Sequence, residues 1–501
     1  MATGDEAAAG GRVHPAGEDA VPPLRADVAV VGAGAAGLYT ALMAAREGAR
    51  VVLISATPLA QTASYWAQGG IAAALAVDDS PARHQADTER AGRGTVRPAA
   101  ARVLTEEAPR AVADLERLGV RFDADRHGNL ALGLEGGHGV RRVVHAGGSA
   151  TGRRVVRDLS ALVVESGRVT VLEDARAAGL WMHEGRAVGV ALQDRRAVAA
   201  RAVVLATGGA AALWARTTNP PGSLGVGLSL AHAAGARLAD LEMVQFHPTA
   251  VIGVPGREGF LVTEAIRGEG ATLHAADGER FVDELAPRDE VARAIHDVLA
   301  RTGTDHVDLD MRGVDPAAFP NVVGALRQFG LDPTRELVPV APAAHYMMGG
   351  VVSDLGARST VPGLLAVGEA ACTGLHGANR LASNSLSECF VFGARAARTA
   401  LDEPESGDLA PPPRAASPPP PQPATRTALW RDAGLTRTRE GLQALSGDPH
   451  RLARLVAACA LARTESRGAH NREDLPRLDP VLDGHHVVVG ADEIPHLERW
   501  D

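Results

Sequence analysis

Lysine is absent from this chain of 501 residues, so all 51 of its basic side chains are arginines. A protein without lysine cannot form a Schiff base with a carbonyl substrate. It also cannot build the phosphate-binding loop of nucleotide hydrolases, which uses a lysine to reach the phosphates. Arginine, alanine and glycine are all abundant, and we attribute this bias to the codon usage of a GC-rich genome rather than to a function.

Cysteine is also scarce, because the chain contains only Cys372, Cys389 and Cys459. Three scattered cysteines are too few for a disulfide framework, and they do not form the ligand set of an iron–sulfur cluster. The sequence therefore predicts a reduced, cytoplasmic setting, and no pattern in it predicts a metal site.

Membrane segments and basic runs are missing as well. No apolar run reaches the length that is needed to cross a bilayer. The first 25 residues are rich in Gly, Ala and Pro and lack the cationic start and apolar core of a signal peptide, so they predict a disordered tail. The net charge of −9 and the absence of a basic run argue against a nucleic-acid surface.

The length and composition indicate a globular protein of several domains. Hydrophobic residues make up 46% and charged residues 22% of the chain, which is ordinary for a globular protein. A length of 501 residues predicts two or three domains. The Pro-rich stretch 411–423 predicts an extended linker, and the apolar pattern from Leu452 to Ala462 predicts a helix after it.

Residues 27–54 carry the fingerprint of a dinucleotide site. Asp27 to Val31 and Ala49 to Ile54 each predict a short strand, and the glycine-rich string between them opens a helix. This string consists of Gly32, Ala33, Gly34, Ala35, Ala36 and Gly37. The first glycine allows a tight turn, the second lets a pyrophosphate approach backbone N–H groups, and the third lets the helix pack on the strand. A chance run in a Gly- and Ala-rich protein is the alternative, but the two flanking strands favour the site.

Four polar strings downstream of the fingerprint carry two histidines and two arginines. The strings are QFHPT at 245–249, APRD at 286–289, AHYMMGG at 344–350 and HGANRLASNSLSE at 376–388. Cationic and proton-donating side chains suit a substrate with two carboxylates, which arginine binds in a two-pronged manner. The candidate site residues are therefore His247, Arg288, His345 and Arg380, although a lone histidine is more often structural.

In this order the strings resemble the succinate dehydrogenase/fumarate reductase flavoprotein superfamily, and most closely its L-aspartate oxidase branch. The resemblance extends from about Asp27 to Ala400, and a weaker similarity is found near Arg467. It implies an α/β fold, α+β overall, in which a capping domain interrupts a Rossmann-like FAD-binding domain and a small helical domain follows. The implied boundaries are 1–25 for the tail, 26–240 and 349–400 for the FAD-binding domain, 241–348 for the capping domain, 401–425 for the linker and 426–501 for the C-terminal helical domain.

The resemblance implies that FAD is the cofactor and assigns further residues to it. A loop that crosses the flavin would contain Ala63, Ser64, Tyr65, Trp66, Ala67, Gln68, Gly69 and Gly70. Core packing explains Tyr65 and Trp66 equally well. Dinucleotide sites usually have a ribose-binding Asp or Glu at the end of the second strand, whereas this chain has Ser55, as aspartate oxidases commonly do. The missing acidic residue makes tight binding of NAD less favourable. Segments 203–209 and 363–370 would return to the nucleotide, and the remaining expected contacts are Glu369, Ser385 and Leu386.

Two departures from the superfamily pattern concern the attachment of the flavin. Membrane succinate dehydrogenases bond the flavin covalently to a histidine, and this chain has Ala63 at that position. The usual Gly-Asp-Gly is replaced by Gly225-Val226-Gly227. The valine removes one hydrogen bond to FAD, which costs about 1 kcal/mol. We therefore expect FAD to bind non-covalently and somewhat less tightly.

The resemblance also implies how the substrate is held. Arg380 and His345 would bind one carboxylate, and His247 and Thr263 would bind the other. Glu135, in the string Leu-Glu-Gly-Gly-His, would meet the α-ammonium group of aspartate, because a carboxylate forms a charge-assisted hydrogen bond with an amine. The alternative for Glu135 is an ordinary glutamate on a surface loop.

Arg288 is the residue that the resemblance assigns to proton transfer, although free arginine is almost always protonated. Glu264 and Arg267 lie three residues apart and would share one face of a helix. They form either a proton relay that connects Arg288 with solvent or a plain structural salt bridge.

The implied reaction is the FAD-dependent oxidation of L-aspartate to iminoaspartate. Oxygen or fumarate would accept the electrons, giving peroxide or succinate. The product would be passed to quinolinate synthase, in the first step of quinolinate and NAD biosynthesis. Two alternatives stay open: a soluble fumarate reductase or succinate dehydrogenase-type flavoprotein, and a non-catalytic flavin-binding subunit for electron transfer.

Overall fold

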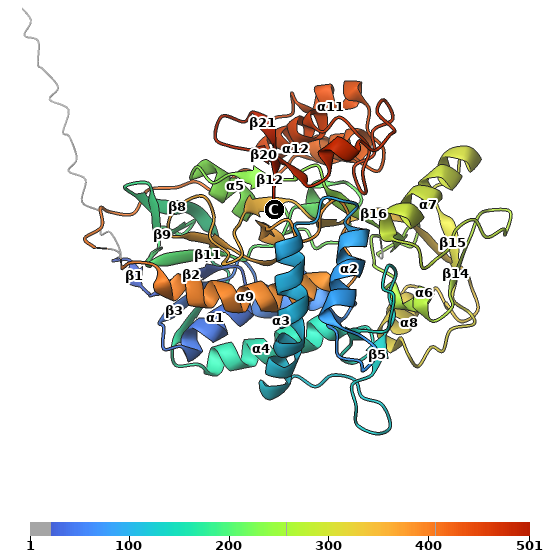
Figure 1. Ribbon diagram of the computed structural model, residues 1–501, viewed down its shortest axis with the longest axis horizontal. Coiled ribbons are helices and arrows are strands. Elements are labelled where there is room, and N and C mark those ends of the chain that lie inside the picture. Colours follow the sequence, from blue (N-terminus) through green and yellow to red (C-terminus); the bar gives the residue numbers. More distant parts are fainter. Residues whose placement is uncertain (1–21, 257, 406) are drawn as a thin grey trace, which may run out of the picture.

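The computed structural model describes residues 22–256, 258–405 and 407–501 (Figure 1). Most of the predicted N-terminal tail, 1–21, lies outside the described residues. Leu24–Arg25, the end of that predicted tail, form strand β1, which pairs in parallel with β10 (Ala197–Ala199). The tail prediction is therefore wrong for these two residues, because their backbone groups find partners in a sheet.

A five-stranded parallel sheet forms the centre of the molecule. Its order is β18 (Leu364–Ala366), β11 (Ala202–Leu205), β2 (Val28–Val31), β3 (Val51–Ile54) and β7 (Val169–Leu172). Every residue of β18, β11, β2 and β3 is buried. Their apolar sequences, rich in Val and Leu, are typical of strands in a parallel sheet that is covered on both faces. The predicted strand–helix–strand unit is confirmed as β2, α1 (Ala35–Arg46) and β3.

Helices cover one side of this sheet and a second sheet lies on the other side. The helices are α1, α3 (Pro98–Arg117), α4 (Thr151–Glu165) and α9 (Asn384–Asp402), and α1 packs along α9. The second sheet has the order β1, β10, β9 (Arg186–Leu192) and β8 (Ala177–His183). Smaller elements near the helices are η1 (Leu59–Gln61), η2 (Ala63–Trp66), α2 (Pro81–Ala91) and the three-stranded sheet β4 (Ile71–Ala72), β6 (Val143–Val144) and β5 (Leu132–Gly133).

The segment that was predicted as a capping domain builds its own sheet and core. The sheet has the order β13 (Val244–Val251), β16 (Val338–Met347), β15 (Val307–Asp310) and β14 (Thr272–His274). Helices α6 (Ala265–Gly268), α7 (Arg288–Thr302) and α8 (Pro320–Arg327) accompany it, and the group stands apart on the right of Figure 1. One hydrophobic cluster extends from Val251 to Val340. The boundaries 241–348 stay a prediction.

The C-terminal region contains the predicted helices and also two strands. The helices are α10 (Pro423–Asp432), α11 (Arg439–Leu445), α12 (Arg451–Ala462) and the short η5 (Pro480–Leu482). The strands complete a sheet in the order β19 (Ala371–Cys372), β17 (Gly350–Val352), β12 (Leu238–Ala239), β20 (His485–Val489) and β21 (Pro495–Arg499). The remaining elements are η3 (Ala211–Leu213), α5 (Val226–Ala233) and η4 (Gly368–Ala370). The C-terminal region is thus joined to the rest of the chain through a shared sheet.

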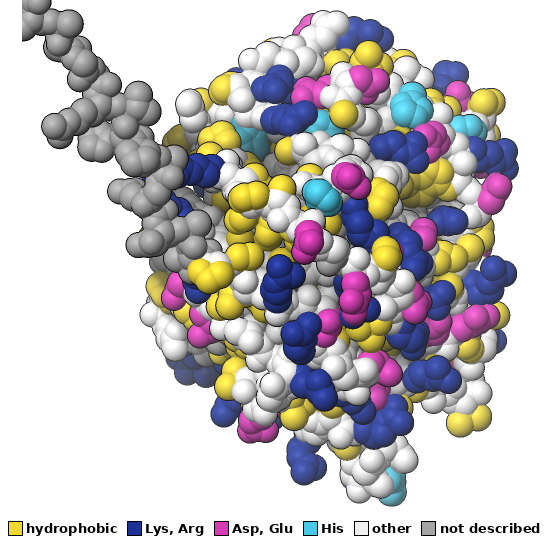
Figure 2. Space-filling model, turned by 90° about the vertical axis from the view of Figure 1, so that its left-hand side faces the viewer, with side chains coloured by type: hydrophobic (Ala, Val, Ile, Leu, Met, Phe, Trp, Pro, Cys, Tyr) yellow, Lys and Arg dark blue, Asp and Glu magenta, His cyan; other side chains and the backbone are white. Residues whose placement is uncertain are grey.

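The Pro-rich linker between α9 and α10 lies against the second sheet. Residues 403–405 and 407–422 form neither helix nor strand, whereas 401–402 belong to α9 and 423–425 to α10, and the extended linker stays a prediction. Leu409 packs against Trp181 and Val188 of that sheet. This side of the molecule faces the viewer in Figure 2, where basic and acidic side chains are mixed across the surface. Within the described part of the chain, no helix is long and apolar enough to cross a membrane.

Candidate active site

Three glycine turns meet at one edge of the central sheet. Strands β2, β11 and β18 run in parallel, so their carboxyl ends lie side by side. Gly32, Gly208 and Gly368 follow these ends, and all three have a positive φ, a conformation that favours glycine. Ligands of open α/β sheets bind outside the carboxyl ends of the strands. The glycine-rich string that predicts a dinucleotide site begins at this edge, and its contacts with a dinucleotide stay a prediction.

The residues at this edge fit a dinucleotide. A Cβ atom on Gly32 would lie 2.2 Å from the carbonyl oxygen of Ala206, and one on Gly37 would lie 1.8 Å from the carbonyl oxygen of Gly32. Only glycine permits these approaches. The first turn of α1 presents N–H groups that have no partner within the helix, which suits a pyrophosphate. The buried hydroxyl of Thr207 has no hydrogen-bond partner among the described residues, so a polar atom is left for a ligand.

The remaining predicted cofactor contacts lie near the same edge or behind it. Ser55 is buried at the end of β3, and its hydroxyl donates to the carbonyl oxygen of Thr57 at 2.6 Å. The Glu369 carboxylate accepts from the N–H of Met347 at 3.0 Å, and loss of hydration raises its pKa to about 7. Leu386 is buried in the core against α1. Contacts of these residues with FAD stay a prediction.

The loop that was predicted to cross the flavin lies against the dinucleotide turn. It begins with η2, and the Ser64 hydroxyl accepts from the backbone N–H of Ala35 at 3.1 Å. At its other end, the N–H of Gly70 donates to the hydroxyl of Ser383 at 3.1 Å. The Gln68 side chain donates to the carbonyl oxygen of Leu261 at 2.6 Å, so the loop also touches the predicted capping segment. The loop therefore connects the cofactor edge with the substrate side.

Trp66 and Tyr65 in this loop have different surroundings. Their rings meet edge to face with centroids 5.3 Å apart. Trp66 is 56% exposed, so core packing is the wrong interpretation for this side chain. Tyr65 is partly buried against the core, and the guanidinium of Arg153 lies 5.7 Å from its ring centroid.

The candidate substrate residues come together from four separate strings. His247 lies on β13 and His345 on the neighbouring antiparallel strand β16, and their ring centroids are 5.0 Å apart. Arg288 is the first residue of α7, and Arg380 precedes α9. Thr263 is buried two residues before α6. The structure thus gathers the four cationic or proton-donating groups that the sequence singled out.

Both histidines are neutral hydrogen-bonding groups. The backbone N–H of Thr249 donates to Nδ1 of His247 at 3.2 Å, so the ring proton of His247 lies on Nε2. That Nε2 atom is buried and has no partner among the described residues, which leaves a donor for a substrate. Nδ1 of His345 is 2.7 Å from the hydroxyl of Thr218. Burial and then the charge of Arg288 hold the pKa of both histidines well below the ordinary value.

Gln245 connects the two arginines, a role that the sequence did not predict. Its Oε1 atom accepts from Nη1 of Arg288 at 3.1 Å and from Nη2 of Arg380 at 3.0 Å. Arg380 also donates to the Ser385 hydroxyl at 3.2 Å and lies 4.6 Å from the ring centroid of Tyr346, while its Nε–H has no partner among the described residues. Burial and the charge of Arg288 lower the pKa of Arg380 to about 10. Gln245 belongs to the QFHPT string, and its place in that string is the only feature of the sequence that could have indicated its role.

Glu264 joins Arg288 to Arg267 in a buried chain of charges. Its Oε2 atom accepts from Nε of Arg288 at 2.5 Å, and its Oε1 atom is 3.5 Å from Arg267 and accepts from the N–H of Gly136 at 2.8 Å. Burial opposes ionisation of Glu264, but Arg288 and Arg267 outweigh it, so the pKa of Glu264 is lowered. Arg267 continues the chain to the carbonyl oxygen of Glu284. The predicted salt bridge is present, and the relay stays a prediction.

Glu135 is buried, not exposed on a surface loop. It is 1% exposed, which excludes the surface-loop alternative. The Ser383 hydroxyl donates to its Oε2 atom at 2.6 Å, and Nε2 of His145 lies 3.5 Å from Oε1. Burial opposes ionisation, but His145 and Ser383 outweigh it and lower the pKa to about 2. A Cβ atom on Gly69 would lie 3.7 Å from Oε1, so the carboxylate is beside the flavin loop.

Comparison with known proteins agrees with this geometry. Residues 27–386 match the family described as FAD binding domain, and residues 447–493 match the fumarate reductase flavoprotein C-terminal family. The L-aspartate oxidase of Caulobacter vibrioides is 46% identical over 482 residues, which cover 90% of this chain and 94% of that protein. The chain belongs to the L-aspartate oxidase family. The L-aspartate oxidase of Nostoc sp. is 50% identical over 395 residues, covering 75% of this chain and 68% of that protein. A variant of E. coli quinol fumarate reductase FrdA shares 27% identity with a TM-score of 0.84 and covers 96% of this chain and 97% of its own.

Membership of this family makes the chain an FAD-dependent oxidoreductase, and the predicted mixed fold is confirmed. Two residues differ from what the wider superfamily would have there. Val226 begins α5 and packs against the hydrophobic core, so its side chain has found an apolar environment. Ala63 begins η2 and offers no atom for a covalent bond to flavin.

Proposed function

We propose that this chain oxidises L-aspartate to iminoaspartate. The observation that carries the proposal is the buried Glu135 carboxylate next to the flavin loop, in a chain whose His and Arg groups suit two carboxylates. FAD, when bound at the carboxyl edge of the central sheet, would supply the two-electron oxidation chemistry that the residues of the chain cannot supply. Everything else in the reaction is assigned to residues of the chain.

Binding of the two carboxylates is assigned to the cluster around Gln245. Arg380 and His345 bind one carboxylate, and His247 and Thr263 bind the other. The unpartnered Nε atom of Arg380 and the unpartnered Nε2 atom of His247 support this assignment, because both are buried donors that a substrate would satisfy. Charge-assisted hydrogen bonds to a carboxylate are about twice as strong as neutral ones.

Recognition of the amino group is assigned to Glu135. Its low pKa keeps the carboxylate ionised, and an α-ammonium group forms a charge-assisted hydrogen bond with such a carboxylate. Ser383 donates to one oxygen of the carboxylate and His145 lies near the other, and both contacts fix the position of the carboxylate. Succinate and fumarate have no group that would use this contact.

Proton transfer is assigned to Arg288. The Glu264 carboxylate is bonded to its Nε atom, and Arg267 lies beyond that carboxylate. This order, from the substrate cluster through Glu264 to Arg267, supports the first part of a proton path that leads away from the substrate, and Arg267 itself is buried. Electrons then leave to oxygen, giving peroxide, or to fumarate, giving succinate. The imine product suits hand-over to quinolinate synthase in the cytoplasm for NAD synthesis.

A soluble fumarate reductase is the main competing function, because it would use the same His and Arg cluster. Glu135 favours aspartate, since a site for succinate or fumarate alone has no use for a buried, ionised carboxylate near the substrate. A non-catalytic electron-transfer subunit is less favoured, because a carrier needs no cluster for two carboxylates.

Anaerobic mixing of the purified flavoprotein with L-aspartate tests the proposed function directly. The oxidised flavin absorbance should bleach with aspartate and stay unchanged with succinate. Bleaching by succinate at a similar rate would support the fumarate reductase alternative. Flavin that stays oxidised with both compounds would contradict oxidation of either.

The flavin itself should be released intact from the denatured protein. Ala63 stands where a covalent histidine would be, so precipitation with acid or heat should transfer all of the yellow colour into the supernatant. The measurement is the flavin absorbance of the supernatant and of the washed pellet. Colour that remains with the pellet would show a covalent bond and refute this prediction.

A further inference from the structure

One turn between α2 and α3 touches the elements that carry both substrate arginines. The turn consists of residues 91–94. The carbonyl oxygen of Ala91 accepts from the side chain of Asn379 at 3.2 Å, and that of Gly92 accepts from the N–H of Ala378 at 3.0 Å. Ala378 and Asn379 immediately precede Arg380. The turn therefore fixes the backbone from which Arg380 projects.

The same turn reaches α7 through the side chain of Arg93. Its Nε and Nη2 atoms donate to the two carboxylate oxygens of Asp289 at 3.1 Å each, the two-pronged geometry that arginine forms with a carboxylate. Arg93 also contacts Glu290. The Asp289 side chain is only 1% exposed, whereas that of Glu290 is 45% exposed. Asp289 is therefore the buried partner, and Glu290 is a peripheral one.

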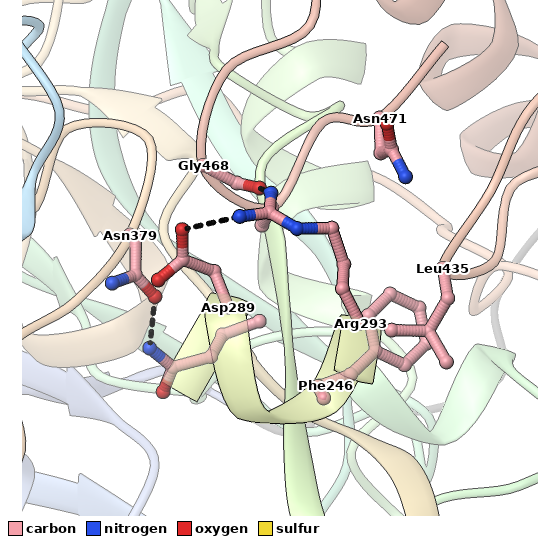
Figure 3. Close-up of a pocket in the computed structure, with 10 residues that line it drawn as sticks. Phe246, Asp289, Arg293, Asn379, Leu435, Gly468 and Asn471 are labelled. Atoms are coloured by element: carbon pink, nitrogen blue, oxygen red, sulfur yellow. Dashed lines mark hydrogen bonds and ion pairs between the residues drawn. The ribbon is translucent and has the colours of Figure 1, made fainter. Parts of the chain in front are cut away.

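Asp289 belongs to the first turn of α7, directly after Arg288. Arg293 of the same helix lies 3.5 Å from the Asp289 carboxylate and donates to the carbonyl oxygen of Gly468 at 3.0 Å. Figure 3 shows Arg293 between Asp289 and Gly468, beside a small cavity that Gln245, Asn379 and other residues line. The first turn of α7 is thus attached to two other parts of the chain at the edge of the substrate cluster.

We propose that Arg93 and Asp289 form a positioning pair that holds Arg288 against the substrate. The pair crosses from the α2–α3 turn to α7, and it lies one residue away from Arg288. The proposal rests on the proposed function, since it takes Arg288 as the proton-transfer residue. Neither Arg93 nor Asp289 is assigned a contact with substrate or FAD.

The geometry explains why this pair acts on Arg288. Removing Arg93 leaves the buried Asp289 carboxylate with only the more distant Arg293 among the described cations near it, and the surrounding backbone has to move to hydrate it. In α7 that backbone is the first helical turn, in which the N–H groups of Glu290 and Val291 donate to the carbonyl oxygen of Pro287 at 2.9 and 3.1 Å, so a movement of this turn carries Arg288 with it. A shift of about 1 Å in a reacting group reduces the rate roughly a hundredfold. A plain structural salt bridge would change stability without selectively changing the rate of the reaction.

The test uses Arg93→Gln and Asp289→Asn in the complete flavoprotein, with Glu290→Gln as the matched control. All three variants remove one charge from the same contact, but only the first two remove the buried pair. Arg93→Gln and Asp289→Asn should lower kcat for L-aspartate at least tenfold, while the KM for aspartate and the FAD content stay within about threefold. Glu290→Gln should stay within about twofold of the wild type. Arg93→Lys should recover part of the loss, because an ammonium replaces one of the two hydrogen bonds.

Amide hydrogen exchange supplies a readout that does not depend on turnover. Peptides covering 288–296 should exchange faster in Arg93→Gln and Asp289→Asn than in the wild type and in Glu290→Gln, at equal FAD content. The double variant should lose no more activity than either single variant, because the two side chains act through one contact. Unchanged exchange in 288–296, or equal kcat in all three single variants, would overturn the positioning role. If aspartate did not reduce the flavin of the wild-type enzyme, the proposed function would be refuted instead. The exchange comparison would then still show whether Arg93 and Asp289 position the first turn of α7.

Discussion

Replacing Arg288 with leucine should remove nearly all L-aspartate turnover while FAD and the inhibitor succinate still bind. Arg288 is 8% exposed at the start of α7 and is bonded to Glu264 and Gln245, so leucine fills part of its volume without a proton-carrying group. Loss of a general acid or base typically costs about 10²- to 10⁴-fold in rate. Stopped-flow bleaching of the flavin under anaerobic conditions measures the loss, and succinate binding is measured by the change in the flavin spectrum.

Arg141→Leu is the matched control for this experiment. The Arg141 side chain is 55% exposed, and its guanidinium lies 3.6 Å from Glu269, which is 51% exposed. Surface ion pairs contribute about 0–1 kcal/mol, so this variant should keep almost the full rate. If Arg288→Leu retained a tenth or more of the wild-type rate, Arg288 would not be the proton-transfer residue.

Replacing Glu135 with glutamine should lower kcat/KM for L-aspartate by about ten- to a hundredfold, because a charge-assisted hydrogen bond worth roughly 1.5–3 kcal/mol becomes a weaker neutral one. The pKa of Glu135 is lowered to about 2 by His145 and Ser383, which outweigh its burial, so the substitution removes a negative charge. Glutamine has almost the same size and still accepts from Ser383. The measurement is steady-state oxidation of L-aspartate.

Fumarate reduction by the chemically reduced enzyme is the internal control for Glu135→Gln. Fumarate has no amino group, so its reduction should change little. Both reactions use one flavin and one cluster of His and Arg residues, and a misfolded variant would lose both. Equal losses in the two assays would mean that Glu135 is structural and that selectivity for aspartate comes from other residues.

The parts of the site that could be predicted from the sequence lie within continuous strings. The glycine spacing at 32–37 specified the turn at the end of β2, because only glycine allows the backbone approaches there. His247, Arg288, His345 and Arg380 each stood inside a recognisable string, and the structure gathers them. Glu135 was predicted to bind an ammonium group because it carries a negative charge, whereas its burial became evident only from the structure.

Contacts that join distant segments could not be predicted. Arg93 and Asp289 are 196 positions apart, and Ser383 and Glu135 are 248 apart. Neither pair has a local spacing that would reveal it, because the contact depends on how two loops pack. The strand β20 was missed for a similar reason. It has only five residues, and it forms a strand because it pairs with β12 and β21.

The turn at 91–94 has a consequence for the order in which the protein acquires its parts during synthesis. The carbonyl oxygen of Arg93 accepts from the guanidinium of Arg467, and that of Gly94 accepts from the N–H of Gly484 at 2.8 Å. A ribosome makes these two partners almost four hundred residues after the turn, although chains begin to fold from the N-terminus while they are being made. The nascent chain therefore contains all strands of the central sheet before it contains the segment that secures its two substrate arginines. The hydrogen bonds that Arg467 and Gly484 donate to this turn can therefore form only when almost the whole chain has been made.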